Sequence, residues 1–169
     1  INCKVYYVLN GGKNDDIGNE INKMAVNTFN LAGKTSKRQS MAVISLATHV
    51  VGSDTGMVHA AEAMGISSTM ILGPTSKETG AGVVLENSVL IENKDLWCRP
   101  CSQNGSRPCY RKEQYCMSEI DSEKVFNEIK EKIDEMNLKF SSPEQIKKFT
   151  ILPRDFSIDD GELTPTLKI

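Results

Sequence analysis

The segment from Gly52 to His59, Gly-Ser-Asp-Thr-Gly-Met-Val-His, has the residue types and spacing of an anion-binding turn. Val50 and Val51 before it are β-branched and predict a strand that runs into a tight turn at Gly52. An alanine-rich helix is predicted to follow the turn. The backbone N–H groups and the positive dipole end at the start of such a helix attract phosphate. The segment therefore predicts a nucleotide-binding half-site.

Four residues of this turn have separate expected roles. Gly56 lets the backbone approach an anion without an intervening Cβ, and Thr55 adds a hydroxyl donor. Asp54 cannot bind phosphate directly, so we expect it to hold the turn by accepting backbone N–H bonds. His59 lies about one turn into the helix, where it can anchor the turn or contact a ligand. A tight turn that binds no ligand is the alternative.

A cysteine cluster lies within a predicted irregular loop at residues 97–116. Four of the five cysteines of the chain share this loop, in the pattern Cys98-x2-Cys101-x7-Cys109-x6-Cys116. Four thiolates can close a tetrahedral zinc site, so a structural Zn site or a disulfide staple is one interpretation. Four reduced cysteines without a ligand are the other. No further cofactor is expected.

Alternating strands and helices must position these residues. Strand character appears in five segments, at residues 4–9, 29–32, 50–51, 69–72 and 83–91, the last as one or two short strands. Helical patterns separate the first four segments. This order predicts an α/β, Rossmann-like fold with a doubly wound parallel sheet.

Capping residues mark where the helices are expected to begin. They are Asn14 or Asp15, Thr35 or Ser36, and Asp121. The helix after Ser36 is expected to place Met41, Ile44 and Leu46 on its apolar side. A further helix, Met57–Met64, is expected to stop at Gly65.

The overall composition excludes some functional classes. The net charge of −2 provides no basic field for nucleic acid. No segment reaches the roughly 18 apolar residues of a transmembrane helix. The first ten residues lack the pattern of a signal peptide, so a cytoplasmic location is expected. Because the first residue is Ile, the chain is interpreted as a fragment of a longer protein.

Three separated motifs closely resemble the heptosyltransferase family, the lipopolysaccharide glycosyltransferases that use ADP-heptose. The motifs are Leu31–Thr35, Val50–Gly65 and Leu72–Thr75, which follow one another at the family's spacing within residues 4–135. The resemblance implies the GT-B fold, in which two Rossmann-like domains face each other across a cleft. Residues 1–137 would then form most of the C-terminal, donor-binding domain.

The resemblance also implies roles for residues. Thr55 and Gly56 would contact the donor diphosphate, Met57 would supply another N–H group, and Asp54 and His59 match family motif positions. The turn formed by Gly33, Lys34 and Thr35 would lie near the adenosine.

The implied reaction transfers a sugar from an ADP-sugar, similar to ADP-heptose, to a lipid-linked saccharide acceptor of lipopolysaccharide type. The enzyme would be cytoplasmic or peripheral to the inner membrane. The catalytic base is expected in the N-terminal domain of the GT-B fold, so the chain alone is expected to be inactive. The cysteine pattern recurs in the family, which argues for a structural feature.

Residues 138–169 resemble a different family, the extreme C-terminus of long-chain acyl-CoA synthetases. The resemblance lies mainly in Glu144–Phe149 and Gly161–Lys168. Lys168 matches a lysine that contacts the acyl-adenylate in that family, and a solvated terminal charge is the alternative. The tail is too short for a core of its own and is expected to be a small α+β appendage. Two alternatives for the whole chain remain, a non-enzymatic module stapled by zinc and a remnant gene fusion.

Overall fold

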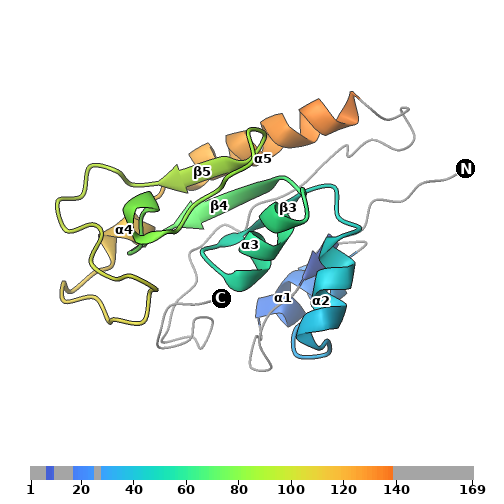
Figure 1. Ribbon diagram of the computed structural model, residues 1–169, viewed down its shortest axis with the longest axis horizontal. Coiled ribbons are helices and arrows are strands. Elements are labelled where there is room, and N and C mark those ends of the chain that lie inside the picture. The colour runs from blue at the N-terminus through green and yellow to red at the C-terminus, as the bar shows by residue number, and fades with distance from the viewer. Residues whose placement is uncertain (1–6, 10–16, 25–27, 139–169) are drawn as a thin grey trace, which may run out of the picture. The chain divides into compact units, whose positions relative to one another are not determined.

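The computed structural model describes residues 7–9, 17–24 and 28–138 (Figure 1). The chain divides into two compact units, one of Ile1–Ser40 with Asn127–Ile169 and the other of Met41–Phe126. The second unit contains the predicted phosphate-binding turn and the cysteine loop. Within the described ranges, no helix is both long and apolar enough to cross a membrane.

In the first unit, a short parallel sheet packs against one helix. Strand β1 (Tyr7–Leu9) pairs with strand β2 (Thr28–Asn30), and helix α1 (Ile17–Met24) lies between them in sequence. A Cβ added at Gly18 would lie 2.7 Å from Oδ1 of Asn30, so a larger residue there would displace the Asn30 side chain where α1 meets the end of β2. The predicted order of strand, helix and strand is confirmed here, but β2 ends at Asn30 and not at Ala32, which lies in a turn.

Helix α2 (Lys37–Ile44) begins where the sequence predicts, after Ser36. The backbone N–H of Ser36 donates to Oε1 of Gln39 at 2.9 Å, and the N–H of Gln39 donates to Oγ of Ser36 at 3.4 Å. These reciprocal bonds form a capping box. The prediction that Leu46 lies on the apolar side of this helix is wrong. The helix ends at Ile44, and the Leu46 residue is 88% exposed.

The second unit contains a three-stranded parallel sheet in the order β3-β4-β5. The strands are β3 (Val50–Ser53), β4 (Ser68–Leu72) and β5 (Val89–Glu92). Helix α3 (Gly56–Ala63) connects β3 to β4, and the 3₁₀ helix η1 (Lys77–Thr79) follows β4. The prediction of a Rossmann-like α/β fold with parallel strands is confirmed.

Strand β3 is longer than the sequence indicates. Gly52 pairs with Met70 and Ser53 pairs with Ile71, so the chain does not turn at Gly52 as predicted. A Cβ at Gly52 would lie 2.9 Å from Cγ2 of Val58. The glycine is therefore required for the close packing of α3 on β3 and not for a turn.

The core of this unit forms where α3 covers the sheet. Val58, Met70 and Leu72 are almost completely buried and pack together. Strand β4 is the central strand, and its near-continuous burial is typical of a strand covered on both faces.

The segment 83–91 forms one strand, β5, and it begins only at Val89. Val84 is 87% exposed, and its N–H group donates to Oε2 of Glu62 at 2.7 Å. The N–H of Leu85 donates to the same oxygen at 2.9 Å. The first part of the predicted strand is thus a loop, because a carboxylate from α3 takes its backbone donors.

An irregular loop follows β5 and leads to two further helices, α4 (Tyr115–Ser118) and α5 (Ser122–Asn137). Oδ1 of Asp121 accepts a bond of 2.9 Å from the N–H of Glu123, which confirms the predicted cap. Residues 139–169 lie outside the described residues, and so do Cys3 and the predicted role of Lys168. The predicted junction near residue 137 stays a prediction.

Candidate functional site

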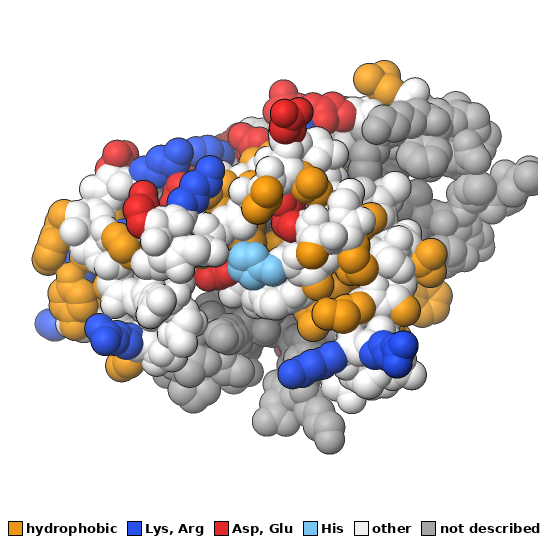
Figure 2. Space-filling model, in the orientation of Figure 1, with side chains coloured by type: hydrophobic (Ala, Val, Ile, Leu, Met, Phe, Trp, Pro, Cys, Tyr) orange, Lys and Arg blue, Asp and Glu red, His pale blue; other side chains and the backbone are white. Residues whose placement is uncertain are grey.

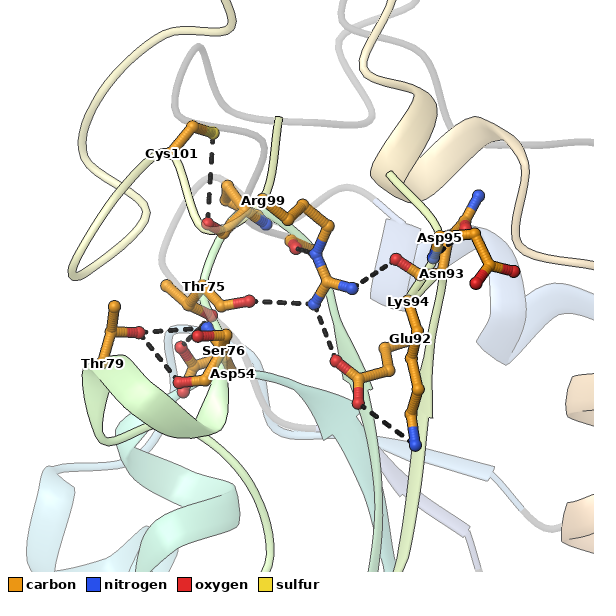
Figure 3. Close-up of polar contacts among 12 residues, drawn as sticks. Asp54, Thr75, Ser76, Thr79, Glu92, Asn93, Lys94, Asp95, Arg99 and Cys101 are labelled. Carbon is orange, nitrogen blue, oxygen red and sulfur yellow. Dashed lines mark hydrogen bonds and ion pairs between the residues drawn. The ribbon is translucent and has the colours of Figure 1, made fainter. Parts of the chain in front are cut away.

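The carboxyl ends of β3, β4 and β5 meet at one edge of the sheet. Ser53 pairs with Ile71, and Leu72 pairs with Glu92, so the residues directly after these strands gather at that edge (Figure 3). Ligands of open parallel sheets bind outside this edge. The predicted turn at Asp54 and the segment at Thr75 therefore lie where a ligand is expected.

The start of helix α3 has free backbone donors. Thr55 caps the helix in an extended conformation, with φ −135° and ψ 157°, and its carbonyl accepts bonds from the N–H groups of Val58 and His59. The N–H groups of Gly56 and Met57 have no hydrogen-bond partner in the part of the chain that is described. A Cβ built at Gly56 would meet no atom within 4 Å. The start of α3 therefore has two unbonded amides, and the Cβ side of Gly56 is open.

Asp54 holds the turn in a different way from the predicted one. Its Oδ1 lies 2.8 Å from Nε2 of His59, and its Oδ2 accepts a bond of 2.8 Å from Oγ1 of Thr75. Its carboxylate thus bonds side chains from α3 and from the next strand end, not backbone N–H groups. The reason is that Ser53 still belongs to β3, which directs Asp54 across the sheet edge. His59 anchors the turn. A histidine side chain is exposed on the face of the molecule drawn in Figure 2.

The Gly33–Thr35 turn belongs to the first unit, whereas the Asp54 turn belongs to the second. Nζ of Lys34 donates to the carbonyl of Asn30 at 2.9 Å, and Oγ1 of Thr35 lies 2.8 Å from Oγ of Ser40. Gly33 has a φ of +66°, a conformation that favours glycine. The proximity of this turn to an adenosine stays a prediction.

Arg99 is a central residue of the strand-end edge that the sequence did not reveal. Its side chain is only 5% exposed and its Nε donates to the carbonyl of Gly73 at 2.6 Å. Nη2 donates to the carbonyl of Thr75 and to Oε2 of Glu92, both at 2.9 Å, and Nη1 donates to the carbonyl of Asn93 (Figure 3). Arg99 therefore connects the ends of β4 and β5 to the cysteine loop.

Signals for this arrangement exist in the sequence but are weak. Glu92 ends a strand whose other residues are apolar, and a half-buried carboxylate needs a cationic partner. Nothing local indicates that Arg99 supplies it. Thr75 follows Gly73-Pro74 at a strand end, which places it near Asp54 only when the strand order is known.

Glu62 is a second buried carboxylate, at 8% exposure, on the face of α3. It accepts bonds from the hydroxyls of Ser68 and Ser88 and from the N–H groups of Val84 and Leu85. Burial alone would raise its pKa, but these four bonds together lower the pKa below its ordinary value of 4.5. The ionised carboxylate ties α3 to β4 and to the loop before β5.

The four loop cysteines are free thiols. Burial, with a smaller contribution from neighbouring Cys101, raises the pKa of Cys116 to about 11. Burial and the thiols of Cys109 and Cys98 also raise the pKa of Cys101. Nη1 of Arg111 lies 3.6 Å from Sγ of Cys98.

Zinc is held by thiolates, so its binding would require these thiols to lose their protons. Over the described ranges, no three His, Cys, Asp or Glu residues are placed to hold a metal ion. The structural Zn site stays a prediction.

The fold and this edge define a Rossmann-like module with a short strand-to-helix turn before α3. The sequence model of glycosyltransferase family 9 (heptosyltransferase) matches residues 2–110. The chain therefore belongs to this family.

Curated relatives agree with the family. The chain is 31% identical over 101 residues to lipooligosaccharide heptosyltransferase 2 of Campylobacter jejuni serotype O:6, which covers 60% of this chain and 31% of that protein. The corresponding protein of serotype O:2 is 29% identical over 101 residues, or 60% of this chain and 30% of that protein. The chain thus spans about a third of the length of these relatives.

A further partial similarity joins the chain to a different kind of protein. It is 52% identical over 42 residues to a long-chain-fatty-acid–CoA ligase of Mycobacterium tuberculosis, which covers 25% of this chain and 7% of the ligase. No solved structure matches the chain at a comparable level of significance.

Proposed function

We propose that the chain is the donor-binding part of a glycosyltransferase that moves a sugar from an ADP-sugar to a lipid-linked saccharide of lipopolysaccharide type. Membership of glycosyltransferase family 9 supports the reaction class, and the names of the lipooligosaccharide heptosyltransferases support the acceptor class. The proposed location is the cytoplasm or the inner face of the membrane, where such lipid-linked acceptors would be reached.

The observation that carries this proposal is the pair of unbonded amides at Gly56 and Met57, beside the open Cβ side of Gly56, within the described residues. Diphosphate oxygens are strong acceptors for such donors at a helix start. When the glycosidic bond to the diphosphate breaks, negative charge grows on the leaving phosphate. Donors fixed in advance by β3 and α3 then stabilise the transition state more than the ground state.

Asp54 acts as a positioning residue in this proposal. A carboxylate next to a diphosphate would repel it, but both oxygens of Asp54 are engaged with His59 and Thr75. The carboxylate thereby holds the turn while the hydroxyl of Thr55 and the two amides remain for the ligand. The Gly33–Thr35 turn is proposed to contact the adenosine. The general base that takes the proton from the acceptor hydroxyl is proposed to come from the other domain of a GT-B enzyme.

Calorimetry with ADP tests the donor site. Wild-type chain should bind ADP, and Gly56→Val should lower the affinity at least about tenfold because its side chain would fill the open space above the amides. The matched control is Ala63→Val, which adds the same kind of branched side chain at the exposed end of α3. Equal ADP affinity for the wild type and Gly56→Val would contradict the proposal.

A further inference from the structure

An exposed pair of aromatic side chains lies on the cysteine loop. Trp97, the one tryptophan of the chain, is 79% exposed, and Tyr110 is 64% exposed. Their ring centroids are 6.4 Å apart, and the ring planes are inclined by 59° to each other. Such rings bury about 150–250 Å² each when they are covered, so they usually lie in cores and interfaces. Two large rings that pack on each other in solvent indicate a contact surface.

Arg111 places a positive charge beside these rings. Its guanidinium carbon lies 5.9 Å from the centroid of the Trp97 ring and 4.1 Å from that of Tyr115, which are cation–π distances. Its Nη1 also lies 3.6 Å from Sγ of Cys98. Among the described residues, no carboxylate forms an ion pair with Arg111. The guanidinium is thus held in place while its charge is not neutralised.

The whole loop is basic, although the net charge of the chain is −2. Within residues 97–116 the only acid is Glu113, and the basic residues are Arg99, Arg107, Arg111 and Lys112. Arg99 is buried with Glu92, but Arg107 and Lys112 are exposed and flank Tyr110 in the sequence. Hydrophobic and Lys or Arg side chains adjoin at the left of Figure 2, where Figure 1 draws this loop. The aromatic–basic patch is defined here as Trp97, Arg107, Tyr110, Arg111 and Lys112.

We propose that the aromatic–basic patch binds the protein to an anionic lipid surface. Trp and Tyr rings prefer the headgroup level of a membrane, where an apolar body and a polar edge are both accommodated. Lys and Arg close to such a surface are attracted by acidic headgroups. Nucleic acid fits less well, because the chain as a whole has no basic field. Only the identity of the membrane, as the one that holds lipid-linked acceptors, rests on the proposed function.

The patch is joined to the strand-end edge that carries the proposed donor turn. The N–H groups of Cys101 and Ser102 both donate to the carbonyl of Pro74, at 3.1 and 3.3 Å. Arg99 bonds the carbonyls of Gly73 and Thr75 after β4. A loop bound to lipid would therefore hold this edge close to the membrane surface, where a lipid-linked acceptor is reached.

The fluorescence of Trp97 tests the proposal directly, because no other tryptophan contributes to the emission. The whole chain is titrated with vesicles of phosphatidylcholine and phosphatidylglycerol in equal parts, and with vesicles of phosphatidylcholine alone. The anionic vesicles should move the emission to shorter wavelength and protect Trp97 from quenching by acrylamide. The neutral vesicles should bind at least about tenfold more weakly, because the attraction of the basic side chains is absent.

Substitutions separate the two parts of the patch, with affinity measured by co-sedimentation with the anionic vesicles. Arg107→Gln and Lys112→Gln should each lower the affinity about fivefold, whereas Arg38→Gln, at an exposed arginine of α2, should leave it unchanged. Trp97→Ala should lower it at least about tenfold. The matched control is Leu46→Ala, which removes a side chain of a residue that is 88% exposed outside the loop. Circular dichroism checks that each variant is folded.

Four outcomes would overturn the proposal. They are an unchanged emission with anionic vesicles, equal binding to both kinds of vesicle, wild-type binding by the Arg107→Gln, Lys112→Gln double variant, and an emission shift that depends on protein concentration without lipid. The last outcome would show that a second copy of the chain covers the patch. An ADP titration separates this proposal from the donor site. ADP binding without vesicle binding would overturn the patch alone, and vesicle binding without ADP binding would support the patch while overturning the donor site.

Discussion

The hydroxyl of Thr75 donates to Oδ2 of Asp54 at 2.8 Å, although the two residues are 21 positions apart in the sequence. The carbonyl of Thr75 accepts a bond from Arg99, so one buried residue connects the turn at Asp54 to the cysteine loop. Asp54 also bonds His59 in α3. The turn is therefore positioned by the neighbouring strand end and not by its own backbone.

Thr75→Val should lower the free energy of unfolding by about 1–2 kcal/mol, because the charged Asp54 acceptor loses its donor. It should also weaken ADP binding, since Asp54 becomes free to move towards the diphosphate. Urea unfolding and calorimetry measure the two effects. Thr75→Ser keeps the hydroxyl and should retain the ADP affinity. Wild-type ADP affinity in Thr75→Val would show that this bond does not position the turn.

Arg99→Met should destabilise the protein by about 3–5 kcal/mol, because Glu92 and three carbonyl groups lose their buried partner. The amides of Cys101 and Ser102 should also exchange faster with solvent. The matched control is Lys94→Met, which removes the other cation near Glu92. Its Nζ lies 3.9 Å from Oε1 and its side chain is 77% exposed, so the cost should be at most about 1 kcal/mol. Equal losses of stability in Arg99→Met and Lys94→Met would refute the assignment of Arg99 as the buried partner of Glu92 and the three carbonyl groups.

Glu62 should make stability depend on pH in the acid range. Its pKa is lower in the folded protein than its ordinary value of 4.5, so its contribution is complete above that value and is lost as the pH falls through the folded pKa. Glu62→Gln should lower the free energy of unfolding by about 1–3 kcal/mol at neutral pH, because the NH₂ group of the glutamine would face the hydroxyl and N–H donors that Glu62 accepts. The free energy of unfolding, plotted against pH, should become flatter below pH 4.5 in this variant only. The exposed Glu86→Gln serves as control, and an identical acid profile in all three proteins would refute the prediction.

Cys116 should be the slowest of the four loop cysteines to react with iodoacetamide at pH 8. With a pKa of about 11, only about a thousandth of its thiol is ionised there, and the side chain is buried. Mass spectrometry of the alkylated peptides measures the order of modification. In denaturant all four cysteines should react at similar rates. Modification of native Cys116 as fast as Cys109 would mean that the thiol is not enclosed as the structure has it.

The strand and helix on either side of the Asp54 turn could be predicted because their signals are local. The β-branched Val50 and Val51 mark the strand, and the small residues after Gly56 mark the helix. The cap at Asp121 and the stop at Gly65, whose φ is +77°, are also properties of single positions. The strand order then follows from the right-handed connections of βαβ units.

What the sequence did not reveal depends on contacts between distant segments. The role of Gly52 required the packing of Val58, and the partners of Asp54 required the register of β3 and β4. Arg99 lies in the segment predicted as an irregular loop, but its guanidinium pairs with Glu92 in the interior. Such pairings are set by tertiary structure, so residue types alone do not identify them.

The most direct measurement is an ADP titration followed by the backbone amide signals of the ¹⁵N-labelled chain. The N–H groups of Gly56 and Met57 have no partner within the described residues, so these two signals should shift most as the diphosphate binds. In the same titration of Gly56→Val, the amide signals of position 56 and of Met57 should not shift. Shifts confined to other parts of the chain, or no shifts at millimolar ADP, would contradict the assignment of this turn as the donor site.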